Sequence, residues 1–201
     1  GAGESLRVRL ERPKVARHDL THQVLPGLWV GGWAALGNDC AELKRRQITH
    51  VLSILSADKR QSPNFVRSHL HLRVDDKEET AAELGTFFAE ICRFIDAARS
   101  EPRGCIFVHC GAGISRAPTA AASYLMWKMG ISAADALRLV ETARPCTRPN
   151  LGFVRQLRAW DLQLRSIRSA QGCGSSQHVD QPLALQPAEG DSSSSSSSSS
   201  S

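Results

Sequence analysis

The sequence has no stretch that suits a membrane span or a secretion signal. No apolar run in its 201 residues approaches the roughly 20 residues that a bilayer-crossing helix needs. The first residues are charged and carry no apolar core segment, so we expect no secretory signal. These absences favour a globular protein of the cytoplasm or nucleus.

Paired metal ligands and a disulfide framework are also missing. The six cysteines are dispersed along the chain without a CxxC pair, so we expect no zinc site. In a chain of this length such cysteines are typical of reduced intracellular thiols. They are Cys40, Cys92, Cys105, Cys110, Cys146 and Cys173.

Aromatic residues are scarce, and the charge is only mildly unbalanced. Aromatic side chains make up 5% of the chain and are not interleaved with basic ones, which argues against a nucleic-acid-binding surface. The net charge is +5, and arginine greatly outnumbers lysine. Because arginine binds phosphate or carboxylate in a bidentate manner, this balance leans towards an anionic ligand. On charge alone, a solvated basic surface is the simpler explanation.

Three zones follow from composition. Residues 1–20 form a basic arm, 21–168 a compact domain, and 169–201 a Ser-rich tail predicted to be disordered, because such a segment buries too little apolar surface. Gly1 and Ser5 fit the N-myristoylation pattern, which would bring the chain to a membrane. A cloning remnant explains the same residues.

Within the domain, segments of strand and helix character alternate, which predicts an α/β fold with a central, mostly parallel sheet flanked by helices. Strands are predicted at 27–32, 49–55, 68–74 and 104–109, and helices at 39–47, 80–99, 117–129, 132–142 and 150–168. Residues at helical spacing are expected in the core, together with Trp33 and Trp127. They are Leu84, Phe87, Phe88, Ile91, Phe94, Ile95, Phe153, Leu157, Trp160 and Leu164.

The stretch "CIFVHCGAGISRAPT" combines an apolar strand, a glycine-containing loop and a helix start. Such a turn points backbone N–H groups and the positive end of a helix at one place, which suits a phosphate-sized anion. Gly111 and Gly113 allow the backbone to bend and approach the ligand, and Arg116 can bind two phosphate oxygens. The same dipoles stabilise a thiolate at Cys110, which could then attack a bound phosphoryl group.

"HCGAGISRAPT" resembles the HCxxGxxR signature of cysteine-based protein tyrosine phosphatases, and most closely that of the small, atypical dual-specificity phosphatases. The resemblance extends over most of the domain. It includes "LPGLWVGGWAAL", "ITHVLSIL", "AASYLMWKMGISAADALRLVETARP" and "PNLGFVRQL", in the order of the family.

The resemblance implies roles for matching residues. Cys110 would be the nucleophile, Arg116 would bind the phosphoryl group and stabilise the transition state, and Asp76, or alternatively Asp75, would be the general acid. His109 and Asn150 would support the loop. The phosphate-binding segment would be Gly111, Ala112, Gly113, Ile114, Ser115 and Arg116. No metal or organic cofactor is implied, because the nucleophile and the acid are protein groups.

The residue after Arg116 departs from the family pattern. The family usually has serine or threonine there, whose hydroxyl helps the cysteine to leave when the phosphoenzyme is hydrolysed, whereas this chain has Ala117. We expect Cys110 still to attack but the phosphoenzyme to be hydrolysed slowly. A water in place of the hydroxyl would make the effect small.

The resemblance implies phosphotyrosine, phosphoserine and phosphothreonine proteins as substrates, with a protein kinase as one candidate partner. The loop "GAGIS" has no basic residue, which argues against a phosphoinositide substrate. Four arginines either form a basic rim for phosphopeptides or are simply exposed: Arg144, Arg148, Arg155 and Arg158. The alternatives are a low-activity or pseudo-phosphatase acting as a phosphoprotein-binding scaffold, or a glycan or RNA phosphatase on the same fold.

Overall fold

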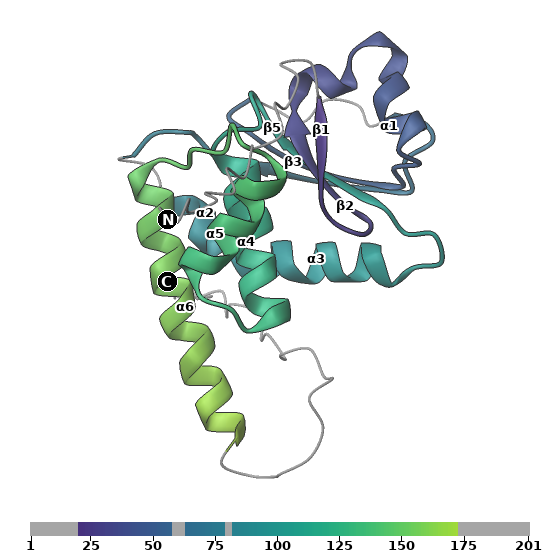
Figure 1. Ribbon diagram of the computed structural model, residues 1–201. Coiled ribbons are helices and arrows are strands. Elements are labelled where there is room, and N and C mark those ends of the chain that lie inside the picture. The colour runs from purple at the N-terminus through teal and green to yellow at the C-terminus, as the bar shows by residue number, and fades with distance from the viewer. Residues whose placement is uncertain (1–19, 58–62, 79–81, 173–201) are drawn as a thin grey trace, which may run out of the picture.

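The computed structural model describes residues 20–57, 63–78 and 82–172 (Figure 1). The expected basic arm, its myristoylation pattern and most of the Ser-rich tail therefore lie outside the described residues.

The core of the molecule is a five-stranded sheet in the order β1-β2-β5-β3-β4. All neighbouring pairs are parallel except β1 and β2, which are antiparallel. This confirms the predicted mostly parallel sheet. The strands are β1 Thr21–Leu25, β2 Leu28–Gly32, β3 His50–Leu55, β4 Ser68–Arg73 and β5 Ile106–Cys110.

Strand β1 was not predicted as a strand. It forms a hairpin with β2 across a tight turn in which Gly27 has a φ of +76°. The Pro26-Gly27 pair is a turn signal, so the sequence carried evidence for this hairpin. The strand places His22 beside Arg144, the residue that follows α5, with consequences for the site.

The middle strand, β5, is buried along its whole length. It ends one residue later than predicted, at Cys110, which pairs in register with Gly32 of β2. Ligands in open α/β sheets bind beyond the carboxyl ends of the parallel strands. Cys110 stands at that edge of the sheet.

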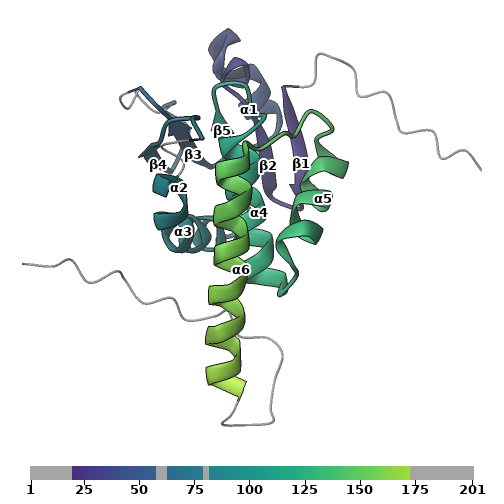
Figure 2. The ribbon, with the colours of Figure 1, turned by 90° about the vertical axis from the view of Figure 1, so that its left-hand side faces the viewer.

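Helices cover the two faces of the sheet unequally (Figures 1 and 2). Most of them pack on one face, while α1 and the 3-10 helix η1 lie on the other. They are η1 Trp33–Leu36, η2 Asn38–Cys40, α1 Ala41–Arg45, α2 Ala82–Thr86, α3 Phe88–Ser100, α4 Arg116–Met129, α5 Ala133–Ala143 and α6 Leu151–Gly172. Within the described ranges, no helix combines the length and apolarity needed to cross a bilayer.

The helix predicted over 80–99 is two helices, α2 and α3, with a break at Phe87. The Phe87 N–H donates to the carbonyl of Leu84, three residues back, so the chain tightens there. Gly85 and Thr86 are weak helix formers, and the Gly85 N–H donates to the Gln156 side chain of α6 rather than along a helix. The break leaves Leu84 and Phe88 fully buried.

The closing helix, α6, confirms the predicted start and extends past the predicted end. The Asn150 Oδ1 atom accepts a hydrogen bond from Phe153 N at 2.9 Å, as an N-cap does. The helix ends at Gly172, four residues beyond 168, and its last turns extend beyond the other helices (Figures 1 and 2). All four predicted core residues of this helix are buried: Phe153, Leu157, Trp160 and Leu164.

Candidate active site

The loop between β5 and α4 carries the predicted nucleophile at its start and the predicted phosphate ligand at its end. Cys110 is the last residue of β5, and Arg116 is the first residue of α4. Cys110 is buried, whereas Gly111, Ala112 and Ile114 are exposed. The thiol thus lies beneath a loop whose outer residues face solvent.

Every carbonyl group from Cys110 to Ser115 is held by a donor of the surrounding protein. Four of the bonds come from backbone N–H groups or a ring nitrogen, and Arg144 supplies the other two. The contacts are His109 Nδ1 to Cys110 O (3.4 Å), Trp33 N to Gly111 O (2.8 Å), Arg144 Nη2 to Ala112 O (3.2 Å), Arg144 Nε to Gly113 O (2.7 Å), Arg148 N to Ile114 O (2.8 Å) and Thr119 N to Ser115 O (3.0 Å).

These contacts determine where the amide groups of the loop point. The peptide bonds are trans, and in a planar trans peptide the C=O and N–H groups point in opposite directions. Because the carbonyls are directed outward to the protein, the N–H groups from Gly111 to Arg116 face the opposite side. Convergent amides at the start of a helix form an anion-binding site.

Two glycines allow the loop to pack closely on strand β2. Gly113 has a φ of +69°, a conformation that residues with a side chain rarely adopt, and a Cβ there would lie 2.3 Å from the Gly31 carbonyl carbon. A Cβ on Gly32 would lie 2.8 Å from the carbonyl oxygen of Ala112. The backbone contact between the loop and β2 therefore requires glycine on both sides.

Arg116 is buried, and the Nη1 atom of its guanidinium group is hydrogen-bonded to other residues of the protein. Its Nη1 donates to Val74 O (2.9 Å) and Ser56 Oγ (3.2 Å). Its Nε is buried and forms no hydrogen bond within the described part of the chain. The Nη2 atom faces the backbone of Gly111, where a Cβ would lie 3.6 Å away. The Nε–Nη2 edge is thus available for an oxygen ligand at the loop.

The structure brings Asp76, rather than Asp75, to the loop. The Asp76 Oδ1 atom accepts hydrogen bonds from Ser115 Oγ (2.7 Å) and Asn150 Nδ2 (3.0 Å). Its Oδ2 atom lies 3.5 Å from Arg116 Nε. Asp75 makes none of these contacts. A carboxyl group is therefore held against the last two residues of the loop, Ser115 and Arg116.

Asn150 connects three elements of the site. Its side chain caps α6 and donates to Asp76, while its backbone N–H donates to Ser115 Oγ at 3.3 Å. The support and capping interpretations of Asn150 are thus compatible. The same residue fixes the acid-bearing segment against the phosphate-binding loop.

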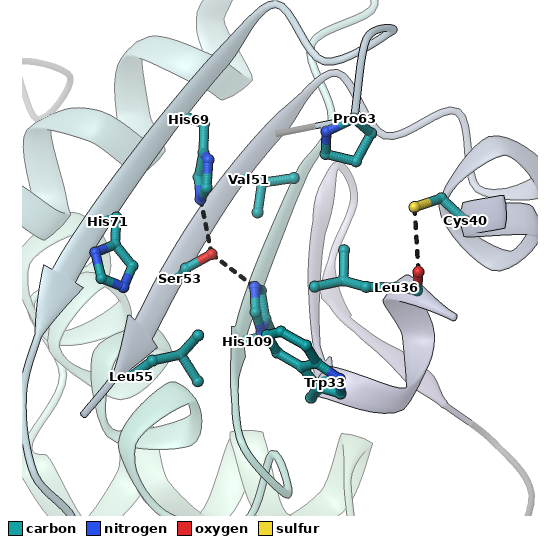
Figure 3. A pocket seen from close by; sticks show the side chains of 10 residues that line it. All are labelled: Trp33, Leu36, Cys40, Val51, Ser53, Leu55, Pro63, His69, His71 and His109. Atoms are coloured by element: carbon teal, nitrogen blue, oxygen red, sulfur yellow. Dashed lines mark hydrogen bonds between the residues drawn. The ribbon is translucent and has the colours of Figure 1, made fainter. Parts of the chain in front are cut away.

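His109 lies on the sheet face opposite the large helices, at the end of a chain of hydrogen bonds (Figure 3). The Ser53 Oγ atom lies 2.7 Å from His109 Nε2 and 2.8 Å from His69 Nε2. The three side chains come from β5, β3 and β4, side by side in the sheet. These hydrogen bonds connect His109 to the next two strands of the sheet, β3 and β4.

The partners of His109 determine its tautomer. The carbonyl of Cys110 can only accept, so the Nδ1 atom of His109 carries the proton and Nε2 accepts from the Ser53 hydroxyl. Ser53 in turn accepts from His69 Nε2–H. Burial lowers the pKa of His109 to about 4, which keeps the ring neutral at physiological pH and suits this arrangement.

A cavity of about 220 Å³ lies against this row of side chains (Figure 3). Its wall is formed by Trp33, Leu36, Cys40, Val51, Ser53, Leu55, Pro63, His69, His71 and His109. Within the ranges that the structure describes, no group of three histidine, cysteine or acidic side chains is arranged to hold a metal ion.

The proposed basic rim is wrong for Arg144. Its side chain is buried, with a relative exposure of 5%, and binds the loop carbonyls from behind. Arg148, Arg155 and Arg158 are exposed, and the first two pair with Glu141 and Glu78. Sequence reasoning missed the contacts of Arg144 and Ser53 because each depends on tertiary burial, for which the local pattern carries no signal.

The chain is similar to known proteins in both sequence and fold. Residues 28–163 match the family model "Dual specificity phosphatase, catalytic domain". The chain is 34% identical over 146 residues to a probable dual specificity protein phosphatase of Dictyostelium discoideum, over 73% of this chain and 35% of that protein. It is 41% identical over 132 residues to dual specificity protein phosphatase 1 of Arabidopsis thaliana, over 65% and 64% of the two chains.

The chain thus spans less than two thirds of the length of both relatives. Among solved structures, it is similar to human DUSP28, with a TM-score of 0.65 and 28% identity. That match covers 73% of this chain and 95% of the other.

The low pKa of His109 predicts a specific acid sensitivity. The folded chain keeps this imidazole neutral while the unfolded chain binds a proton below pH 6.5, so the free energy of unfolding should fall as pH drops from 6.5 towards 4. The shift corresponds to a loss of about 3 kcal/mol. Urea unfolding of the wild type and of His109→Gln at pH 7 and pH 4.5 measures it. An equal loss in both proteins would contradict the assignment.

Proposed function

The chain belongs to the dual specificity phosphatase catalytic-domain family, and we propose that it hydrolyses phosphate esters of tyrosine, serine and threonine in proteins through a cysteinyl-phosphate intermediate. One observation supports this above all. Cys110, Arg116 and Asp76 meet at a loop whose carbonyls are all held outward, so that its amides converge on one site.

In the first step, the Cys110 thiolate attacks the phosphorus atom of the bound ester. The S–P bond forms as the bond between phosphorus and the ester oxygen breaks. The loop amides and the Nε–Nη2 edge of Arg116 bind the three remaining phosphoryl oxygens and stabilise the charge that they carry in the transition state. Protonated Asp76 gives its proton to the leaving oxygen, so the product is the neutral alcohol or phenol.

In the second step, water attacks the phosphorus atom of the cysteinyl phosphate. Asp76, now a carboxylate, takes a proton from the water as the new O–P bond forms and the S–P bond breaks. Inorganic phosphate and the Cys110 thiolate are released. Ser115 and Asn150 hold Asp76 through Oδ1, which leaves Oδ2 for the transfer in both steps.

The exposure of the loop supports substrates of differing length. Gly111, Ala112 and Ile114 are exposed around the buried thiol, and Ile114 has a relative exposure of 38%. Because these residues are open to solvent, the loop is accessible to the short side chains of phosphoserine and phosphothreonine as well as to phosphotyrosine.

The hydroxyl groups nearest to Ala117 in sequence do not replace the missing one. The Ser115 hydroxyl donates to Asp76, and the Thr119 hydroxyl donates to the carbonyl of Ser115. A hydroxyl has only one proton to donate, so neither donates to the Cys110 sulfur in this arrangement. We therefore propose that the second step is slow relative to the first.

The cysteines support a reducing location such as the cytoplasm or nucleus, where a reactive thiolate persists. The five described cysteines, Cys40, Cys92, Cys105, Cys110 and Cys146, are free thiols. Cys173 lies outside the described residues.

The assay that tests the function is the time-resolved release of 4-nitrophenol from 4-nitrophenyl phosphate without added metal. We expect an initial burst close to one equivalent of enzyme, followed by slower turnover, and no release by Cys110→Ser. A folded wild-type protein that binds a phosphopeptide but releases no product would refute the enzymatic role and favour the scaffold alternative.

Asp76 and Asp75 are a matched pair for testing the general acid. Asp76→Asn should reduce kcat by about 10²- to 10⁴-fold on a phosphoserine peptide, because an alkoxide leaves poorly without a proton. Asp75→Asn should retain wild-type kcat. The assignment of Asp76 as the general acid is wrong if Asp75→Asn shows the larger loss of kcat.

Ala117→Ser restores the hydroxyl that the family usually has. A hydrogen bond to the leaving thiolate contributes about 1.5–3 kcal/mol, so steady-state turnover should rise by roughly 10- to 100-fold and the burst should disappear. Pre-steady-state kinetics of the variant and the wild type measure both changes. Unchanged turnover in the serine variant would show that hydrolysis of the phosphoenzyme is not the slow step.

A further inference from the structure

Arg144 is a buried guanidinium group with three neutral acceptors. Its Nε and Nη2 donate to the carbonyls of Gly113 and Ala112, and its Nη1 donates to His22 Nδ1 at 2.7 Å. Across the described part of the chain, no carboxylate lies within 4 Å of it, although the other buried arginine, Arg116, approaches Asp76. A buried charge without an opposite charge is costly, so its retention beneath an anion-binding loop requires explanation.

Among the residues that the structure describes, Arg144 is also the only one outside the loop whose side chain binds the carbonyls of its two central residues, Ala112 and Gly113. The carbonyls of Gly111 and Ile114, on either side, are bound by backbone N–H groups of Trp33 and Arg148. Those two bonds persist whatever side chain the donor residue carries, provided that the backbone keeps its path. The orientation of the two central peptide groups, in contrast, depends on the guanidinium of Arg144.

We propose that Arg144 is a positioning residue for phosphate binding, an inference that rests on the proposed function. By holding the carbonyls of Ala112 and Gly113 outward, it directs the opposed N–H groups of Gly113 and Ile114 at the bound phosphoryl group. Its planar fork spans two successive carbonyls, which a lysine ammonium does not match. The negative charge of the bound phosphoryl group offsets the unpaired positive charge of Arg144.

The role predicts weaker binding of phosphate with an intact fold. In Arg144→Met, the inhibition constant of inorganic phosphate and the KM for 4-nitrophenyl phosphate should both rise by about tenfold or more, as expected when two charge-assisted hydrogen bonds are lost. Neither constant depends on the fraction of folded enzyme, so loss of stability alone would leave both unchanged. Arg138→Met is the matched control, because Arg138 is exposed and its side chain pairs, among the described residues, only with Asp135 on α5.

Two further variants distinguish the effect of the guanidinium geometry from that of its charge. They also keep the proposal testable if Arg144→Met fails to fold. Arg144→Lys keeps the positive charge but reaches one carbonyl, so its phosphate inhibition constant should lie between those of the wild type and Arg144→Met. In Arg144→Ala, added methylguanidinium should restore phosphate affinity, whereas methylammonium at the same concentration should not.

The proposal is overturned if Arg144→Met or Arg144→Lys binds phosphate as tightly as the wild type, or if methylammonium rescues Arg144→Ala as well as methylguanidinium does. A wild-type protein without phosphatase activity would instead refute the proposed function. Its phosphate affinity, measured by titration followed by NMR, would still test the role of Arg144.

Discussion

The outward orientation of six successive carbonyl groups, from Cys110 to Ser115, is the constraint on which the candidate site depends. A loop of this length has no regular hydrogen-bond partner of its own, and each unpaired buried carbonyl would be unfavourable. The surrounding protein supplies a donor to every one. Because the peptide unit is rigid, satisfying these acceptors on one side creates an array of donors on the other. The anion site is thus a geometric consequence of how the loop is attached to the fold.

The two faces of the sheet contribute to the site in different ways. On the face covered by the large helices, an apolar core surrounds β5 and α4 and fixes the positions at which the loop begins and ends. On the other face, β5, β3 and β4 carry a polar row of His109, Ser53 and His69 beside a cavity. The face covered by the large helices holds the larger of the two clusters of buried apolar residues. On the other face, the contacts of His109 with Ser53 and with the Cys110 carbonyl set the tautomer of the histidine next to the thiol. The neutral His109 ring connects this row to the backbone of Cys110 through the contact between its Nδ1 atom and the Cys110 carbonyl oxygen.

Much of this could be predicted from sequence because it depends on short-range pattern. The glycine-containing loop, its Cys110 and Arg116, the core face of α6 and its Asn150 cap are all encoded by spacing within a few residues. The choice between Asp75 and Asp76 needed the structure, since only the fold shows which carboxyl reaches Ser115 and Asn150. Arg144 was misread as a surface residue because its burial depends on β1 and the loop, both distant in sequence. The break at Phe87 was hidden by an apolar periodicity that continues through it.

The attachment of the loop also bears on when the site can form during folding. Apart from His109 of β5, its donors come from η1, α4 and the segment between α5 and α6. Arg144 in turn donates to His22 of β1, 122 residues away in sequence. Contacts of such separation close long loops of chain, and the entropy cost of closing these loops must be met before the contacts can stabilise the fold. A chain that lacks these contacts therefore has the cysteine but not the anion-binding site around it. Catalytic competence is then a property of the completed tertiary structure, and recovery of activity after denaturation should report the last stage of refolding.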